Sequence, residues 1–201
     1  MPRALSLHPY DAVRARWPAT GNHIIASYTD DAVLVYQAFN DDIADYALAR
    51  QRFAGCPRYN ATRMTWVKTN FLWMMKRSGY ASKKNQTRIL GLWLRKAAFD
   101  DILSKARFKG PGSGKLRVQW DPDYSPELQR LKRRRDIQLG IKQRASFQQG
   151  DDFIEIVDYT EAARTARATR RVPDERVYLP EDEALREYLQ LGRVTFGVIA
   201  L

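Results

Sequence analysis

The residues best suited to chemistry lie together in segment 63–79, which mixes large aromatic rings with positive charges. The members that could hold phosphate are Arg63, Lys68 and Arg77, and those that could stack on a base or a nicotinamide ring are Trp66, Phe71 and Trp73. Charge beside a flat π surface binds a nucleotide without requiring one particular base. The rings could instead belong to the core, which is the favoured interpretation for Leu72, Met74 and Met75.

Three further candidates follow from their places on predicted strands. Arg135 begins a predicted strand, and Gln138 on the same strand could point into the same cleft. Strand alternation puts Glu155 on a face with apolar neighbours, so this face is either exposed or holds a site carboxylate. The cationic run Lys132–Arg135 is typical of a solvated face or a nonspecific nucleic-acid patch.

Charge is distributed unevenly along the chain. The formal net charge is +11, and the isoelectric point is near 9.9. From Tyr46 to Phe99 there is no Asp or Glu, while both ends of the chain are mildly acidic. A basic centre of this kind favours a phosphate partner, either a nucleotide or a nucleic acid. The remaining possibility is that these cations only solvate the surface.

Several classes of site are excluded by composition. One cysteine, Cys56, and two histidines cannot supply the ligands of a structural zinc site, so no metal is expected. The loop Lys109–Lys115 lacks the first glycine and the hydroxyl of a phosphate-binding P-loop. No apolar run is long enough to cross a membrane, and the first residues do not form a signal peptide. We therefore expect a cytoplasmic protein without a membrane partner.

The elements that would position these residues predict an α+β fold, with a mainly antiparallel central sheet and flanking helices in one domain. The predicted strands are 24–28, 32–39, 63–67, 88–94, 116–120, 136–141 and 153–157. The predicted helices are 9–17, 41–52, 71–78, 97–106, 161–170 and 180–191. Thr29–Asp31 has the composition of a hairpin turn between the first two strands, and 121–126 is rich in turn residues. We expect a main domain at 1–170 and a variable C-terminal tail at 171–201 with a short helix and an apolar end.

Four blocks of this sequence resemble those of a known family. They read IIASYTDDAVLVYQAFNDDIADYALARQRF, RMTWVKTNFLWMMKRSGYASKKNQTRILGLWL, LRVQWDP and RDIQLGI, in that order. The sequence from about Ile24 to Thr160 is similar to the family catalogued as domain of unknown function 4291 (DUF4291). Three positions depart from the family pattern, since Ile25, Asn70 and Asp136 replace its usual Arg, Ser and Ser. These changes would weaken phosphate binding if the positions lay in the cleft.

The strand Val35–Phe39 and the helix after it also resemble part of the ADP-ribosyltransferase fold. This resemblance implies NAD as the cofactor, with Tyr36 and Gln37 on the nicotinamide ribose and Trp66 or Trp73 stacked on the nicotinamide. It implies that Gln138 or Glu155 orients the acceptor or stabilises the transition state. The leading hypothesis is thus an ADP-ribosyltransferase-like enzyme or NAD binder. The alternatives are an RNA-binding module without catalysis and a structural or interaction protein.

Overall fold

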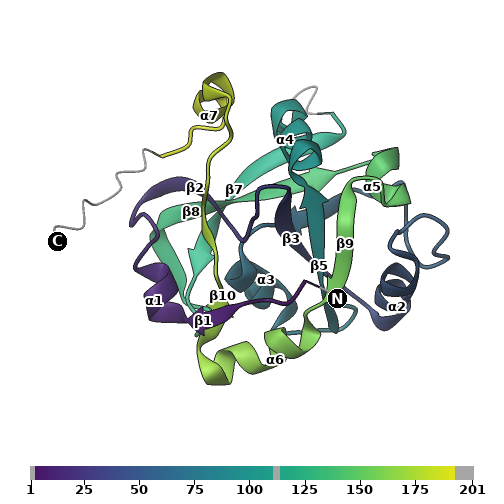
Figure 1. Ribbon diagram of the computed structural model, residues 1–201, viewed down its shortest axis with the longest axis horizontal. Helices are drawn as coiled ribbons and strands as arrows, with labels where there is room; N and C mark the ends of the chain where they lie inside the picture. The colour runs from purple at the N-terminus through teal and green to yellow at the C-terminus, as the bar shows by residue number, and fades with distance from the viewer. Residues whose placement is uncertain (1–2, 111–113, 193–201) are drawn as a thin grey trace.

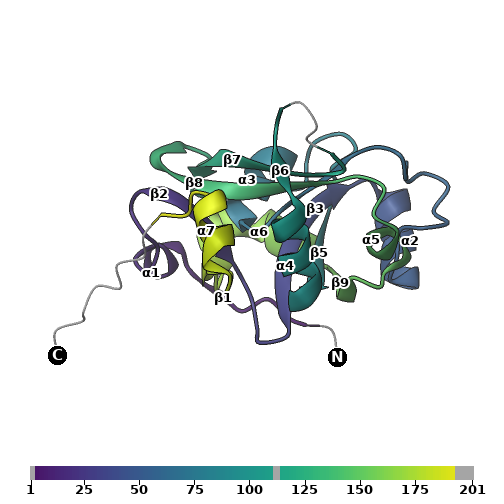
Figure 2. The ribbon, with the colours of Figure 1, turned by 90° about the horizontal axis from the view of Figure 1, so that it is seen from above.

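The computed structural model describes residues 3–110 and 114–192, and it is an α+β domain as expected (Figure 1). The strands are β1 Leu7–Pro9, β2 Gly21–Ala26, β3 Ala32–Phe39, β4 Thr65–Lys68, β5 Arg88–Arg95, β6 Arg107–Phe108, β7 Leu116–Tyr124, β8 Arg130–Ile141, β9 Phe153–Asp158, β10 Arg171–Pro173 and β11 Arg176–Tyr178. The helices are α1 Tyr10–Arg14, α2 Asp41–Arg50, α3 Phe71–Ser78, α4 Lys96–Lys105, α5 Ala145–Gln149, α6 Thr160–Thr169 and α7 Glu183–Tyr188. In Figures 1 and 2, α1 lies at one end of the molecule and α2 with α5 at the other.

A nine-stranded sheet forms the centre of the fold, in the order β11-β2-β8-β4-β3-β5-β9, with β7 on β8 and β6 on β7. Most neighbours are antiparallel, as predicted, whereas β2–β8 and β6–β7 are parallel. The strand β3 pairs with β5 along its whole length, from Ala32↔Arg95 to Phe39↔Arg88. A separate two-stranded sheet joins β1 to β10.

Each face of the sheet buries its own apolar core. Val33 and Val35 face one core together with α2, α4, α5 and α7. Leu34 and Tyr36 face the other core together with α1, α3 and α6. Strand alternation explains the division, because successive side chains point to opposite faces.

The two helices nearest the site begin at asparagine side chains, and α3 ends at a glycine. The Asn40 side chain accepts from the Ile43 N–H at 3.1 Å and begins α2. The Asn70 side chain accepts from the Trp73 N–H at 2.9 Å and begins α3. Gly79 ends α3 with φ of 60°, a left-handed conformation that glycine adopts without strain. In Figure 2, α3 lies on the side of the molecule opposite β9 and the described N-terminal segment.

Three sequence-based expectations about elements were wrong or only partly right. The predicted turn at Thr29–Asp31 does close, with the Thr29 N–H donating to the Ala32 carbonyl and the bridge Tyr28↔Val33 beside it. The ladder goes no further, because β2 pairs instead with β8 and β11. The turn-rich 121–126 continues β7 to Tyr124, with a bulge at Pro122 that accommodates the missing N–H. The cationic run belongs to β8, which begins at Arg130 rather than at Asp136.

Residues 171–192 are built into the fold. The strand β11 pairs antiparallel with β2, from Arg176↔Ala26 to Tyr178↔Ile24. Between β10 and β11, the fully buried Glu175 accepts from the Phe71 N–H at 2.7 Å and from the Asn70 amide at 3.2 Å. This carboxyl therefore binds the first backbone N–H of α3. The predicted apolar end 194–201 lies outside the described residues. No described helix is long and apolar enough to cross a membrane.

Candidate anion-binding cleft

A cleft of about 650 Å³ lies where β3 and β4 separate. These neighbouring strands share a single register pair, Tyr36↔Lys68, in the described chain. Continued pairing would place Ala38 opposite Trp66, but both residues line the cleft instead. On the N-terminal side of Tyr36, the Leu34 N–H donates to the Ser27 carbonyl. Because backbone direction alternates along a strand, the N–H and C=O of Ala38 point to that same side, into the gap.

Positive charge dominates the cleft wall. The charged residues that line it are Arg58, Arg63, Arg77 and Lys84, and none of its described lining residues is an Asp or Glu. Arg58 is partly neutralised by Asp42 at 3.4 Å, where both side chains are exposed. Arg63, Arg77 and Lys84 have no carboxylate within ion-pair distance in the described chain. Three uncompensated cations at one opening will attract an anion.

Two tryptophan rings are held at the cleft by packing. Trp66 lies over Gly140, where an added Cβ would approach the indole to 2.9 Å, so a side chain at position 140 would displace the ring. Trp73 stands on the first turn of α3, and the Lys68 ammonium lies 4.9 Å from its ring centroid. Both rings are partly exposed and line the cleft. They could therefore stack on the flat ring of a ligand.

Two glutamines bring amide groups to the cleft wall. Gln37 donates through Nε2 to the Thr65 hydroxyl, while its Oε1 is buried without a partner among the described residues. If the amide were turned over, Nε2 would be the unpaired atom, so one end lacks a partner in either orientation. Gln138 accepts from the Gln119 amide at 2.6 Å through Oε1. Its Nε2 has no protein acceptor among the hydrogen bonds of the described chain.

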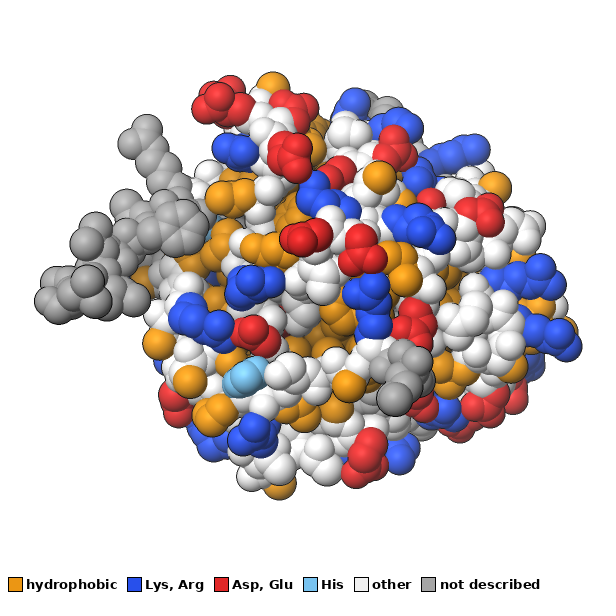
Figure 3. Space-filling view, in the orientation of Figure 1, with side chains coloured by type: hydrophobic (Ala, Val, Ile, Leu, Met, Phe, Trp, Pro, Cys, Tyr) orange, Lys and Arg blue, Asp and Glu red, His pale blue; other side chains and the backbone are white. Residues whose placement is uncertain are grey.

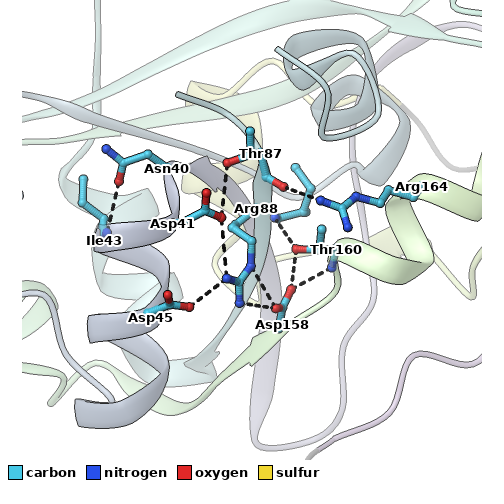
Figure 4. Close-up of polar contacts among 10 residues, drawn as sticks. Asn40, Asp41, Ile43, Asp45, Thr87, Arg88, Asp158, Thr160 and Arg164 are labelled. Carbon is cyan, nitrogen blue, oxygen red and sulfur yellow. Dashed lines mark hydrogen bonds and ion pairs between the residues drawn. The ribbon is translucent and has the colours of Figure 1, made fainter. Parts of the chain in front are cut away.

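The helix α2, whose first turn lines the cleft, is fixed by Arg88 at the start of β5 (Figure 4). The Arg88 guanidinium donates to Asp158 of β9 at 2.6 Å and to Asp45 of α2 at 2.7 Å. Asp41 lies 3.7 Å away from the same group. Burial alone would raise the pKa of Asp158, but hydrogen bonds from Thr160 and Arg88 lower it overall. One cation therefore joins α2, β5 and β9 behind the cleft.

Six of the ten sequence-predicted site residues line this cleft: Gln37, Arg63, Trp66, Trp73, Arg77 and Gln138. Tyr36 does not, because strand alternation turns it into the core, where its ring meets Phe71 edge-on at 5.5 Å. Lys68 is also fully buried, and it donates to the Asp136 carbonyl at 2.9 Å. Burial lowers the pKa of Lys68. Neither residue reaches a ligand in the cleft.

Arg135 and Glu155 lie elsewhere on the surface. The odd-numbered side chains of β8 face the core opposite α3, so Arg135 points away from the cleft and donates to the Trp120 carbonyl at 3.4 Å. Glu155 lies on β9 at the edge of the sheet and accepts from the Arg3 backbone N–H at 3.0 Å. The expectation that these two residues join the site was therefore wrong. Phe71, the third proposed stacking ring, is fully buried in the core.

The three departures from the family pattern share one buried place outside the cleft. The Ile25 N–H donates to Asp136 at 3.2 Å, and Thr69, beside Asn70, donates to the same oxygen at 3.4 Å. Burial raises the pKa of Asp136 to about 7. Burial also raises the pKa of Glu175 well above its usual value. None of the three lines the cleft, so the condition under which they would weaken phosphate binding is not met.

Sequence reasoning missed most of the cleft wall. The missed residues include Arg58, Tyr59, Asn60, Thr65, Lys84, Asn85 and Gln86, which come mainly from two loops. Only the absence of acids from Tyr46 to Phe99 pointed to them, because that span contains both loops.

The opposite face of the molecule differs in charge, as Figure 3 shows Lys and Arg interspersed with Asp and Glu around an apolar hollow.

The fold and the cleft together define an α+β protein with a basic cleft in a split sheet. A family model described as "Domain of unknown function (DUF4291)" matches residues 23–184. The chain therefore belongs to the DUF4291 family, as its sequence blocks indicated. A search of curated proteins found no match.

Proposed function

We propose that this protein binds a nucleotide in the cleft, with the phosphates against Arg63, Arg77 and Lys84 and a ring against Trp73 or Trp66. The observation that carries the proposal is a cleft wall with uncompensated cations and two partly exposed indoles but no described carboxylate. A volume of about 650 Å³ suits a small-molecule ligand. The Gln138 amide, whose Nε2 has no protein acceptor among the described residues, offers this ligand a polar partner at the wall.

NAD and ADP-ribose are the ligands to test first, because each combines a diphosphate with a flat base. Titration calorimetry should give saturable binding of both below millimolar concentration, and nicotinamide alone should bind far more weakly. The double variant Arg63→Gln/Arg77→Gln should lose at least about tenfold in affinity, since each charged contact contributes roughly 1–3 kcal/mol. Arg50→Gln/Arg52→Gln removes the same charge at and just after the C-terminal end of α2, outside the cleft wall, and should bind as the wild type does. An absence of heat at millimolar ligand would reject the proposal.

Within this proposal, the reaction to test is ADP-ribosyl transfer from NAD. Nicotinamide would leave with the electrons of its bond to ribose, and an acceptor nucleophile would replace it and release a proton. Among the uncharged polar residues of the wall, Gln37 and Gln138 are the two predicted from the sequence, and Gln138 has an amide nitrogen without a protein acceptor in the described chain that could orient a reacting group. Gln138→Ala should slow nicotinamide release while NAD still binds. Release at the wild-type rate would remove Gln138 from the chemistry.

A further inference from the structure

A second group of cations begins at the edge of the cleft and continues over the end of α3. It consists of Lys76, Arg77, Lys83 and Lys84 around the helix C-terminus and Arg130 at the start of β8. We call this group, with Tyr124, the α3 track. All five cations are exposed, and none forms an ion pair with a described carboxylate.

Contacts between α3 and the end of β7 make the track continuous. The Lys76 ammonium lies 5.7 Å from the centroid of the Tyr124 ring. Tyr124 is the register partner of Arg130, and paired residues of an antiparallel ladder point to the same face. Tyr80, just after α3, donates its hydroxyl to the Pro126 carbonyl and fixes the β7–β8 turn against the helix. Tyr124 therefore lies between Lys76 on one side and its register partner Arg130 on the other.

Helix capping explains only part of this group. Lys83 donates to the carbonyls of Lys76 and Arg77 at 3.2 and 3.1 Å, an ordinary role for a cation at a helix C-terminus. Arg77 instead lines the cleft, Lys76 covers an aromatic ring, and Arg130 comes from a strand. The acidic groups nearest in sequence are engaged elsewhere, since Asp123 pairs with Arg134 and Glu127 with Arg170.

We infer that the α3 track binds a single-stranded nucleic acid, which passes the opening of the cleft. A line of cations interleaved with aromatic rings is the arrangement that follows a phosphate backbone while bases stack. Tyr124 lies at one end of this line, and Trp73 lies where it enters the cleft. A duplex would hide the base faces from both rings, so a single strand is the better partner. Arg77 and Lys84 belong to both the cleft and the track, so the inference rests on the proposed function for these two residues alone.

Fluorescence anisotropy with a labelled single-stranded RNA of mixed sequence tests the track. The double variant Lys76→Gln/Arg130→Gln should bind about tenfold more weakly at low salt. The slope of log affinity against log salt should fall by about 1.4, since each lost phosphate contact in a single strand removes about 0.7. The control Arg50→Gln/Arg52→Gln removes two exposed cations outside the track and should keep the wild-type slope. Equal RNA affinity and slope in the two double variants would overturn the inference.

This design tests the nucleotide cleft and the α3 track independently. Lys76→Gln/Arg130→Gln should leave ADP-ribose binding unchanged, because neither residue lines the cleft. RNA binding that depends on the track, without any ADP-ribose binding, would reject the nucleotide proposal and keep the track. Polyglutamate of matched charge should compete poorly with the RNA, because it has no bases to stack. Equal competition by polyglutamate would overturn the choice of nucleic acid as the partner.

Discussion

At the scale of single residues, the Trp73 ring contacts both the cleft and a buried cation. Its indole lines the cleft, and the buried ammonium of Lys68 lies 4.9 Å from the ring centroid. The ring is thus oriented by a charge that no ligand touches, because Lys68 is fully buried. A preorganised ring costs less conformational entropy when a ligand stacks on it.

Replacing this ring should separate stacking from folding. Trp73→Ala should weaken ADP-ribose binding by about 1–3 kcal/mol, or roughly five- to 150-fold, because stacking on an aromatic side chain contributes that much. Trp73→Phe keeps a ring and should retain most of the affinity. Calorimetric titration measures both variants, with circular dichroism to confirm that they are folded. Equal affinity in Trp73→Ala and the wild type would remove the indole from the binding site.

Asp136 should make stability depend on pH. Burial raises its pKa from 3.8 to about 7 in the folded protein. Between those values, the folded state keeps a proton that the unfolded state has released, so stability falls as pH rises from about 4 to 7. One such group contributes a slope of up to about 1.4 kcal/mol per pH unit.

The variant Asp136→Asn cannot ionise, so it should show a flatter pH dependence and greater relative stability at pH 8. Urea denaturation at several pH values gives the comparison. The amide oxygen can still accept from the N–H groups of Ile25 and Ile137, which the aspartate binds at 3.2 and 2.7 Å. A slope identical to that of the wild type would show that this carboxyl does not titrate in the range.

At the scale of elements, Arg88 joins three that are far apart in sequence. Its side chain is 20% exposed and contacts Asp45 of α2 and Asp158 of β9. Arg88→Gln should destabilise the fold by about 1–2 kcal/mol, since hydrogen bonds to charged groups are lost while the partly exposed partners regain water. The pair Arg58–Asp42 is exposed on both sides, so Arg58→Gln should change stability by less than about 0.5 kcal/mol. Urea denaturation that ranks the two variants in the reverse order would contradict this.

Helices were easier to predict than strand partners. Asn40, Asn70 and Gly79 act within a few residues along the chain, so the start of α2 and both ends of α3 could be predicted from the sequence. Pairing of β2 with β8 is a long-range choice that no local pattern encodes, and for this reason the predicted hairpin extends no further than one bridge. The cleft was predicted in part, because charge and aromatic type are visible in a sequence. Tyr36 and Lys68 were misplaced because alternation around an unpredicted split decides which face each one takes.

At the scale of the whole molecule, residues 171–192 complete the structure that supports the cleft. A chain ending at residue 170 would lose β11 from the edge of β2 and Glu175 from the N-terminus of α3. It should therefore fail to unfold cooperatively, as measured by circular dichroism during heating. Glu175→Gln in the full chain keeps an acceptor for the Phe71 N–H and should stay cooperative. Cooperative unfolding of the shortened chain would show that 1–170 folds alone.

The single pair Tyr36↔Lys68 also gives the sheet a mechanical property. The strands β3, β5 and β9 form one half of the sheet, and β4, β8 and β2 form the other. In the described chain, backbone contacts between the halves run from the bridge Tyr28↔Val33 to the pair Tyr36↔Lys68, and beyond that pair only side chains connect the halves at the cleft. Small rotations of the two halves about this pair would widen or narrow the opening, and the backbone hydrogen bonds within each half would stay intact. A bound ligand that contacts both halves would hold them together and reduce this motion. Hydrogen exchange at the Tyr36 and Lys68 amides should then slow on ligand binding, while exchange at amides in the interior of each half of the sheet stays unchanged.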